Sequence, residues 1–332
     1  MGCRPGFGST PFLRLFRPWP MPAYQIERSI LVSVPPSGVF AVVSDFNTWS
    51  SWSPWLIADP GATVRVSGEP GSVGSGYSWS GEVTGAGDME LRKVERGRRL
   101  EIELRFLRPF KSRAEVVFEL QANPAGTLLT WRMSGSLPWF LFWMIPMLKT
   151  FVGLDYHRGL LMLKDWIETG RIDSKTTSHG VTPVGPLRMF GVRASAHLET
   201  VGTVGPPAME RSQQLFRQHG LPVTGEGIAV YHHLAVKTGM LDFIIGRVVP
   251  DSATLPKGTD LCEWRLPAVR AFRVEFEGAY HHLGNGWSVA NQLARHHKLK
   301  QSNAGAFELY RPLAKGAAPT DRKVDIFLPL KG

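Results

Sequence analysis

Residues 137–170 read LPWFLFWMIPMLKTFVGLDYHRGLLMLKDWIETG. Apolar residues recur at helical spacing and turn formers are few, which predicts a long helix. Pro146 lacks an amide hydrogen, so we expect the helix to be kinked or broken there. The apolar run before Lys149 is shorter than the roughly 20 residues that cross a bilayer. The stretch therefore predicts a helix packed on a sheet, with a membrane-touching lip over 137–152 as the alternative.

The residues before this helix predict an antiparallel sheet. Residues 24–34 alternate apolar and polar side chains, as a strand does, and residues 37–44 follow two prolines as a short helix. An aromatic turn over 45–55 comes next. Short strand-like runs separated by turn residues then follow, at 63–66, 76–79, 90–94, 100–107, 114–120 and 127–133. The fold class is thus α+β, with an antiparallel sheet around a long C-terminal helix.

The second half shows a weak internal repeat of one strand, one helix and two strands. The first unit is expected at 189–198, 208–219, 227–233 and 240–249, and the second at 269–277, 287–297, 306–310 and 324–328. Such a duplication predicts a cleft at the seam between the units. Residues 171–186 are polar and Ser/Thr-rich, which is typical of a linker. The predicted domains are therefore 22–170 and 187–332.

Composition excludes several classes of protein. The hydrophobic share of 43% and the charged share of 20% indicate a globular chain. Two cysteines, Cys3 and Cys262, exclude a disulfide framework and favour a reducing cytoplasm. Residues 1–21 contain no apolar run long enough for a secretory signal or a membrane span, and the myristoylation pattern fails at Gly6. We expect this arm to be disordered or absent, with Met21 as a plausible start.

The formal net charge of +10 raises the question of nucleic acid. Residues 22–170 are electrically balanced, and the excess is spread over the first 21 residues and 171–332. No helix-turn-helix pattern, paired Cys/His finger or basic heptad region is evident. Direct nucleic-acid binding is therefore not expected, and a general attraction to anionic surfaces accounts for the charge.

Motifs in the first half resemble a known superfamily. The stretch Trp49-Ser-Ser-Trp-Ser-Pro-Trp55 is similar to a signature of the polyketide cyclase/dehydrase-like group of the START/SRPBCC superfamily. Further matching segments follow in order, at 76–81, 85–90, 107–111, 130–135 and 155–164. The resemblance covers about 22–170 and implies a helix-grip domain that encloses a small apolar or amphipathic ligand.

The second half resembles a GyrI-like, AraC-type effector-binding domain. Leu266-Pro267 precedes a strand, Glu277-Gly-Ala-Tyr280 leads into a helix with Trp287, and Phe307–Tyr310 matches the family's Glu-x-Tyr. The resemblance covers about 187–330 and implies a cleft that receives an effector. Asn285-Gly286 departs from the smooth helix entry of the family, so we expect the pocket mouth to differ from the family's usual form.

Tryptophans are the candidate ligand contacts of the first domain. Trp79 and Trp131 offer large apolar area with one donor each, although tryptophans in this region also serve to lock helices onto the sheet. No paired carboxylates and no nucleophile–base set are evident, so the residues do not demand cyclase chemistry.

Glu308 is the strongest candidate of the second domain. Strand alternation places Phe307 and Leu309 on one face and Glu308 with Tyr310 on the other. The resemblance implies that the glutamate looks into the cleft. A buried carboxylate would have a raised pKa and would attract a cationic aromatic ligand, with Tyr280 and Trp287 stacking on it. The alternatives are a surface ion pair and a general base that hydrolyses strained electrophiles.

Other candidate chemistries find little support. His232-His233, His281-His282 and His296-His297 are adjacent pairs, and neighbours in a strand or helix point to different faces, so no metal is predicted. Phosphate-binding and nucleophile-elbow motifs are missing, and no cofactor is expected.

Three functions remain open at this point. The first is a non-enzymatic binder or sensor of small apolar or amphipathic molecules, which include organic cations. The second is a hydrolase or cyclase-like enzyme that uses Glu308 or the helix-grip cavity. The third is a lipid carrier that docks on membranes through residues 137–152.

Overall fold

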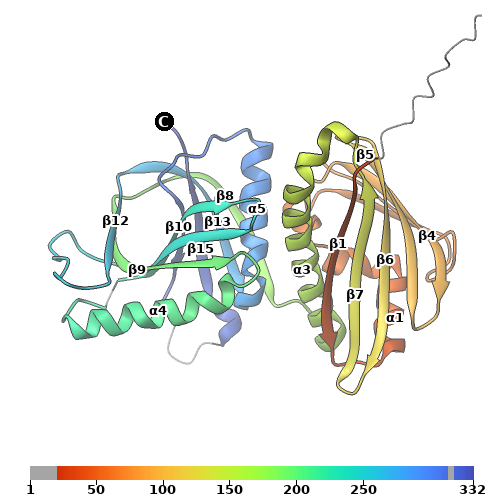
Figure 1. The fold of residues 1–332 in the computed structure, drawn as a ribbon, viewed down its shortest axis with the longest axis horizontal. Helices are drawn as coiled ribbons and strands as arrows, with labels where there is room; N and C mark the ends of the chain where they lie inside the picture. Colours follow the sequence, from red (N-terminus) through yellow and green to blue (C-terminus); the bar gives the residue numbers. More distant parts are fainter. Residues whose placement is uncertain (1–20, 224, 313–317) are drawn as a thin grey trace, which may run out of the picture.

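Two antiparallel sheets organise the chain, one in each half, with helices between and around them (Figure 1). The computed structural model describes residues 21–223, 225–312 and 318–332. The predicted N-terminal arm lies almost entirely outside the described residues. The α+β class predicted from the sequence is confirmed, since a seven-stranded and an eight-stranded sheet are combined with helices.

The first sheet has the strand order β1-β7-β6-β5-β4-β3-β2, with every neighbouring pair antiparallel. Its strands are β1 (Ala23–Val32), β2 (Thr63–Ser67), β3 (Gly76–Ser80), β4 (Ala86–Glu95), β5 (Arg99–Arg108), β6 (Ser112–Asn123) and β7 (Gly126–Ser136). Between β1 and β2 lie α1 (Pro36–Ser44), η1 (Phe46–Thr48), α2 (Trp49–Trp52) and η2 (Leu56–Ala58). Strand alternation points the apolar side chains of this sheet toward the helices.

Helix α3 (Ile145–Thr169) follows the short 3-10 helix η3 (Trp139–Met144) and packs mainly along β1. The expected break near Pro146 is present, because the 3-10 helix η3 ends at Met144 and α3 begins with this proline in its first turn. The amide that proline lacks would have no intrahelical partner in the first turn, so Pro146 is well placed at the start of α3. Gly170 ends the helix in the left-handed conformation that glycine adopts without strain.

The second sheet has the order β12-β9-β11-β10-β14-β15-β13-β8. Its strands are β8 (Ser174–Val184), β9 (Leu187–His197), β10 (Gly227–Ala235), β11 (Met240–Val248), β12 (Cys262–Leu266), β13 (Val269–Gly278), β14 (Ala306–Tyr310) and β15 (Lys323–Pro329). Helix α4 (Val201–Gln218) packs on β9 and β11, and α5 (Leu283–His296) on β13 and β15. Units β9-α4-β10-β11 and β13-α5-β14-β15 therefore repeat, and they meet where β10 pairs with β14.

The segment predicted to be a linker, 171–186, is mostly strand β8. Its polar residues form an edge strand because β13 supplies a ladder of partners along its length, from Ser174 opposite Gly278 to Val184 opposite Val269. Pairing with a neighbour, rather than its own hydrophobicity, gives this segment its structure. Strand β12, at the opposite edge of the sheet, was also not predicted.

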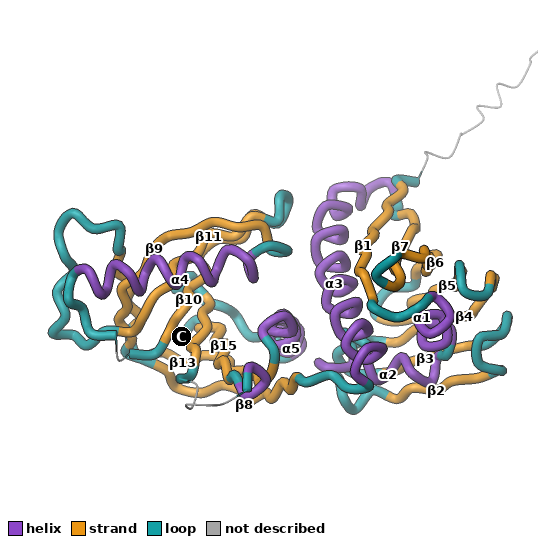
Figure 2. Tube along the Cα trace, turned by 90° about the horizontal axis from the view of Figure 1, so that it is seen from below, coloured by secondary structure: helices purple, strands orange, loops and turns teal. Residues whose placement is uncertain are grey.

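The two halves are packed together through α3 and α5, which lie side by side between the sheets (Figures 1 and 2). Arg158 on α3 is buried and donates to Asn285 Oδ1 (2.8 Å) and Ser288 Oγ (2.9 Å) on α5. Asp155 accepts from the same guanidinium at 2.5 Å. Ala58 of the first half belongs to one apolar cluster with Val289 of the second. The contact between the halves thus combines an apolar cluster with the hydrogen-bonded guanidinium of Arg158.

Asn285 and Gly286 do not interrupt the helix, as their sequence had suggested they would. Both are buried within α5. A Cβ on Gly286 would lie 2.7 Å from Ile326 Cδ1, so close packing on β15 requires glycine. These two residues mark where α5 meets the sheet and the other half of the chain. Nowhere in the described residues is a helix both long and apolar enough to cross a membrane.

Candidate functional site

Glu308 lies on β14 at the seam between the repeated units. It is opposite Ala229 of β10 and Ile326 of β15. Strand alternation places its neighbours Phe307 and Leu309 in an apolar cluster on the other face of the sheet. The predicted division of faces is therefore confirmed, and Glu308 lies on the side that carries α5.

Aromatic side chains surround the Glu308 carboxylate. Trp287 on α5 donates its indole N–H to Oε1, and Tyr310 donates its hydroxyl to Oε2. Tyr231 on β10 packs edge-on against Trp287, with ring centroids 5.1 Å apart. We call Tyr231, Tyr280, Trp287 and Tyr310 the aromatic cage. It joins residues from both repeated units around one acid.

Folding removes the carboxyl group of Glu308 from water. The residue is only 1% exposed. Burial raises the pKa of Glu308, although hydrogen bonds from Tyr310, Trp287 and Tyr231 lower it. Within the part of the chain that the structure describes, no basic side chain is among the groups that shift this pKa. Among the described residues, the carboxylate is thus satisfied by neutral donors alone.

Tyr280 forms the outer edge of the cage. It is 41% exposed and belongs to the 3-10 turn η4 (Tyr280–His282), which precedes α5. Its ring lies 6.1 Å from that of Tyr310, and the Arg322 guanidinium lies 4.4 Å from its centroid. A cation therefore already stacks on the outer side of the cage.

The two predicted contacts of the first domain lie in different surroundings. Trp131 is 2% exposed and stacks with Phe118 and with Tyr156, at centroid distances of 5.1 and 4.0 Å. Trp79 is half-buried and donates to the Thr84 carbonyl at 3.4 Å. A Cβ on Gly87 would lie 2.3 Å from the Trp79 ring, so this ring packs directly on the backbone of β4. The structure therefore does not bring Trp79 or Trp131 near Glu308.

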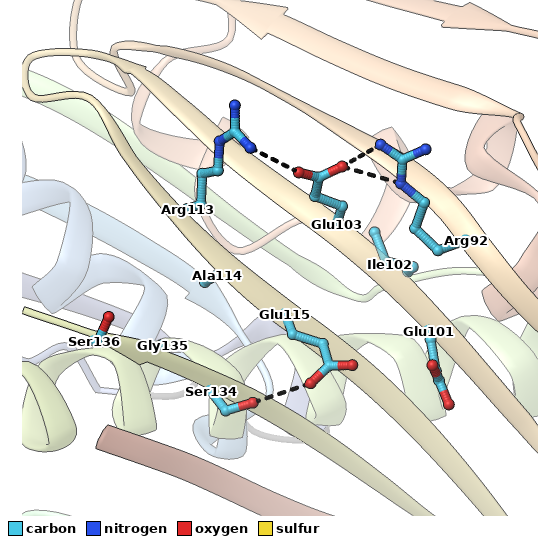
Figure 3. A pocket seen from close by; sticks show the side chains of 10 residues that line it. All are labelled: Arg92, Glu101, Ile102, Glu103, Arg113, Ala114, Glu115, Ser134, Gly135 and Ser136. Carbon is cyan, nitrogen blue, oxygen red and sulfur yellow. Dashed lines mark hydrogen bonds and ion pairs between the residues drawn. The ribbon is translucent and has the colours of Figure 1, made fainter. Parts of the chain in front are cut away.

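Two hollows lie away from the cage. One of about 390 Å³ is on the polar face of the first sheet, where Arg92, Glu103, Arg113 and Glu115 line it (Figure 3). Glu103 is paired there with Arg92 and Arg113, and Glu115 accepts a hydrogen bond from Ser134. The other, of about 180 Å³, lies between the two halves, beside the ion pair of Arg28 with Glu199. Neither hollow has the apolar lining of a typical ligand pocket.

A second cluster of polar side chains joins α3 to η4. Asp165 on α3 lies 2.9 Å from His281 Nε2 and 3.4 Å from His282 Nε2, measured from Oδ2. The argument that adjacent histidines diverge is wrong for this pair, because the tight 3-10 turn brings their ring centroids within 4.1 Å. Burial, with a contribution from neighbouring His281, lowers the pKa of His282 to about 4, so this ring is neutral at pH 7.

Comparison with protein families agrees with the geometry of the first half. Residues 23–168 match the family described as polyketide cyclase / dehydrase and lipid transport. The first half of the chain therefore has an SRPBCC-like helix-grip fold, as the motifs around Trp49–Trp55 had indicated. No curated protein matches the chain.

Several solved structures are similar to parts of the chain. Protein MLL2253 from Mesorhizobium loti is 18% identical over 45% of this chain and 99% of its own, with a TM-score of 0.34. CalU16 from Micromonospora echinospora is 19% identical over 45% of this chain and 77% of its own, with a TM-score of 0.31. EcmrR, in a complex with DNA, is 15% identical over 54% of this chain and 65% of its own, with a TM-score of 0.38.

Sequence reasoning found most of the cage but missed Tyr231. This tyrosine lies in the first repeated unit, whereas the other members lie in the second. The signal that would have found it is the repeat itself, because duplicated units meet at their corresponding strands. Asp165 was missed for a similar reason, since it comes from the helix-grip domain and its partners from the other half.

Proposed function

We propose that this protein is a non-enzymatic small-molecule binder whose second domain accepts an organic cation at Glu308. The observation that carries the proposal is a buried carboxylate enclosed by aromatic rings without a basic partner among the described residues. Desolvating a charge is costly, and a ligand cation would offset that cost directly. Aromatic faces would add cation–π attraction, which favours a flat or aryl-substituted cation over a simple ammonium.

The cage has to open on one side for such a ligand. Trp287 and Tyr310 are half-buried and bonded to Glu308, whereas Tyr280 reaches the surface. Tyr280 also lies on a short 3-10 turn, which is easier to move than a sheet strand. We infer that the ligand enters past Tyr280 and displaces the Arg322 stack.

The second half resembles an effector-binding domain, which supports a role in sensing a ligand. Effector-binding domains of regulators report a ligand to an attached domain, and here the attached domain is a helix-grip domain. The Arg158 network and the shared apolar cluster provide a rigid contact through which ligand binding in one half would influence the other. The helix-grip domain would hold an apolar or amphipathic molecule of its own.

Isothermal titration with two probes of one shape and opposite charge tests the cation site. Tetraphenylphosphonium should bind the wild-type protein, and tetraphenylborate should not. Glu308→Gln should weaken phosphonium binding at least tenfold, because it removes the charge and keeps the shape. The matched control is Glu277→Gln, which removes a half-buried carboxylate paired with Lys323 on the neighbouring strand. Equal binding of both probes, or unchanged binding by Glu308→Gln, contradicts the proposal.

The enzymatic alternative predicts a different result for the same variant. If Glu308 were the general base of a hydrolase, Glu308→Gln would abolish turnover of strained electrophiles such as epoxides with little loss of binding. Steady-state turnover measured beside the titration separates the two functions. Loss of binding without any wild-type turnover supports the binder.

A second candidate function, docking on an anionic membrane, is favoured by exposed aromatic side chains at one end of the first domain. Trp139, Phe140, Phe142 and Trp143 on η3 are each 57–62% exposed. Phe110, in the loop between β5 and β6, is 82% exposed. Strand register places this loop beside η3, because Ala114 of β6 is opposite Gly135 of β7. Contiguous exposure of this kind is characteristic of interaction surfaces.

The charge of this end fits anionic lipid headgroups. Residues 104–114 contain four basic residues and no acid, and residues 133–154 contain Lys149 and no acid. Arg108, Lys111, Arg113 and Lys149 are exposed. Tryptophan and phenylalanine insert at the headgroup boundary while basic side chains contact the lipid phosphates.

Vesicle flotation tests the docking function. The protein should float with vesicles of phosphatidylcholine and phosphatidylglycerol and far less with phosphatidylcholine alone. Phe142→Ser with Trp143→Ser should abolish flotation, whereas Val73→Ser, which changes an equally exposed apolar residue in the loop between β2 and β3, should not. A protein that stays in the aqueous fraction with both vesicles contradicts docking.

A further inference from the structure

The cluster of Asp165, His281 and His282 holds three groups that can bind a metal ion. The candidate ligand atoms lie within 4.8 Å of one another. Each comes from an element fixed at the contact between the two halves, since α3 carries the carboxylate and η4 carries both imidazoles. His281 and Asp165 are partly exposed, with 46% and 28% of their side-chain surface accessible, so an ion can enter from solvent.

The orientation of His282 leaves one ring nitrogen without a well-aligned hydrogen bond. Its Nδ1 lies 3.2 Å from Ser174 Oγ on β8, which fixes the ring. Its Nε2 is buried and has no well-aligned hydrogen-bond partner, although Asp165 Oδ2 is 3.4 Å away and the Leu161 backbone also interacts with the ring. The nitrogen therefore does not point along the line to that oxygen. Two atoms that bind one metal ion also lie close together without pointing at each other, because each points at the ion between them.

The distances are close to those of a zinc site. Zinc binds imidazole nitrogen and carboxylate oxygen at about 2.0–2.2 Å, which places two ligand atoms of a tetrahedral site about 3.3 Å apart. The observed separations from Asp165 Oδ2 are 2.9 Å and 3.4 Å. The ligand atoms of the two histidines lie within 4.8 Å of each other, and His281 is exposed, so its ring can turn toward a common ion. A ring nitrogen fixed through its other nitrogen is also the arrangement that surrounds most metal-bound histidines.

We propose that Asp165, His281 and His282 form a site for Zn²⁺ or a similar divalent transition metal that joins the two domains. Imidazole with a carboxylate suits these ions better than Mg²⁺ or Ca²⁺, which prefer oxygen ligands alone. Three protein ligands leave one tetrahedral position open toward solvent. Ser174 is a positioning residue that orients His282.

Metal binding at this site would also stiffen the edge of the cage. Tyr280 directly precedes the two histidines in η4, and Trp287 follows them on α5. An ion that ties η4 to α3 would therefore restrain the turn past which the cation is inferred to enter. This part of the inference rests on the proposed cation site, whereas the metal site itself does not.

Zinc titration of chelator-treated, full-length protein tests the site. The wild-type chain should bind one Zn²⁺, and Asp165→Asn or His282→Gln should weaken binding at least tenfold. The matched control replaces another adjacent pair, His232→Gln with His233→Gln, and should bind zinc as the wild type does. No saturable binding, or unchanged binding by Asp165→Asn, overturns the proposal.

Two further measurements test the zinc site even if Asp165→Asn and His282→Gln fold poorly. Ser174→Ala leaves all three ligands in place and should weaken zinc binding about tenfold, as loss of a residue that orients a ligand does. Co²⁺ bound to the wild-type chain should show the intense visible bands of tetrahedral coordination. The weak bands of octahedral Co²⁺ would overturn the assignment.

Coupling to the cage is measured separately. Saturating Zn²⁺ should change tetraphenylphosphonium affinity in the wild type and not in Asp165→Asn, and by reciprocity phosphonium should change zinc affinity equally. Glu308→Gln should still bind zinc. Zinc binding without phosphonium binding would reject the cation site and keep the metal site, whereas the reverse would reject the metal site alone.

Discussion

The chain contains two aromatic clusters that differ in what lies at the centre. In the first domain Trp131 is surrounded by other rings, among them Trp49, Phe118 and Tyr156. In the second domain the rings surround a carboxylate, that of Glu308. The first cluster is part of a hydrophobic core, and the second is the proposed cation site. Aromatic content alone does not distinguish the two clusters, but a buried carboxyl group with no basic partner among the described residues does.

The largest effect expected from this comparison is on Trp131. Trp131→Ala should lower the free energy of unfolding by about 3–5 kcal/mol, because it removes a buried ring and leaves a cavity. Denaturant unfolding measures this change. Trp143→Ala, on an exposed position, should stay within about 0.5 kcal/mol of the wild type. A mild effect at Trp131 would mean that the first cluster is less tightly packed than a core.

Replacing Glu308 should raise the free energy of unfolding, whereas replacing Trp131 should lower it. The folded-state pKa of Glu308 is raised, so the ionised group destabilises the fold above that pKa, and this cost disappears below the unfolded-state pKa. Glu308→Gln should therefore be more stable than the wild type at pH 7.5, by about 0.5–2 kcal/mol, as relief of a functional site often is. Thermal melts at several pH values should show the difference shrinking on acidification. A variant less stable at every pH would place Glu308 among structural residues.

The affinity for a cation should depend on pH through the ionisation of Glu308. Because burial raises the pKa of Glu308, tetraphenylphosphonium affinity should begin to fall at a pH above the usual range of glutamate. Below that point it should drop about tenfold per pH unit, as expected when one proton competes with the ligand. Titrations from pH 8 to pH 4 would show it. An affinity that is flat over this range would indicate binding elsewhere.

The smallest effect is expected at the edge of the cage. Tyr280→Ala should weaken phosphonium binding several-fold, since an exposed cation–π contact contributes about 0.5–1 kcal/mol. It should leave the unfolding free energy almost unchanged, because the side chain is 41% exposed. Titration of Tyr280→Phe, which keeps the ring, supplies the control. A large stability loss in Tyr280→Ala would show that the ring supports the fold instead.

Much of the fold could be predicted because local pattern and final environment agree. The alternation in β14 placed Glu308 and Phe307 on opposite faces, and both faces are as expected. Strand β8 escaped prediction because its polar residues acquire their structure from β13, a distant segment. The break near Pro146 was predictable because a proline disrupts a helix interior but is accepted in the first turn, where α3 begins. The residue pattern of a short segment does not reveal which distant strand will pair with it, nor at which residue a helix begins.

The candidate sites show the same limit. Glu308, Trp287 and Tyr310 were found because one repeated unit holds all three, whereas Tyr231 belongs to the other unit. His281 and His282 appeared unsuited to a common ion because a regular helix or strand would separate them. The tight turn η4 brings them together, and α3 of the other domain brings Asp165.

The position of β8 affects how the protein can be divided. Only residues 170–173 separate the end of α3 from this strand, which borders β13 along its whole length. A fragment starting at residue 187 would lack β8, so the backbone amides and carbonyls of β13 would be unpaired along one edge of the sheet. Such an unprotected margin recruits strands from other copies, so the fragment would tend to aggregate. Cutting the gene before residue 174 would keep this protective strand with its sheet.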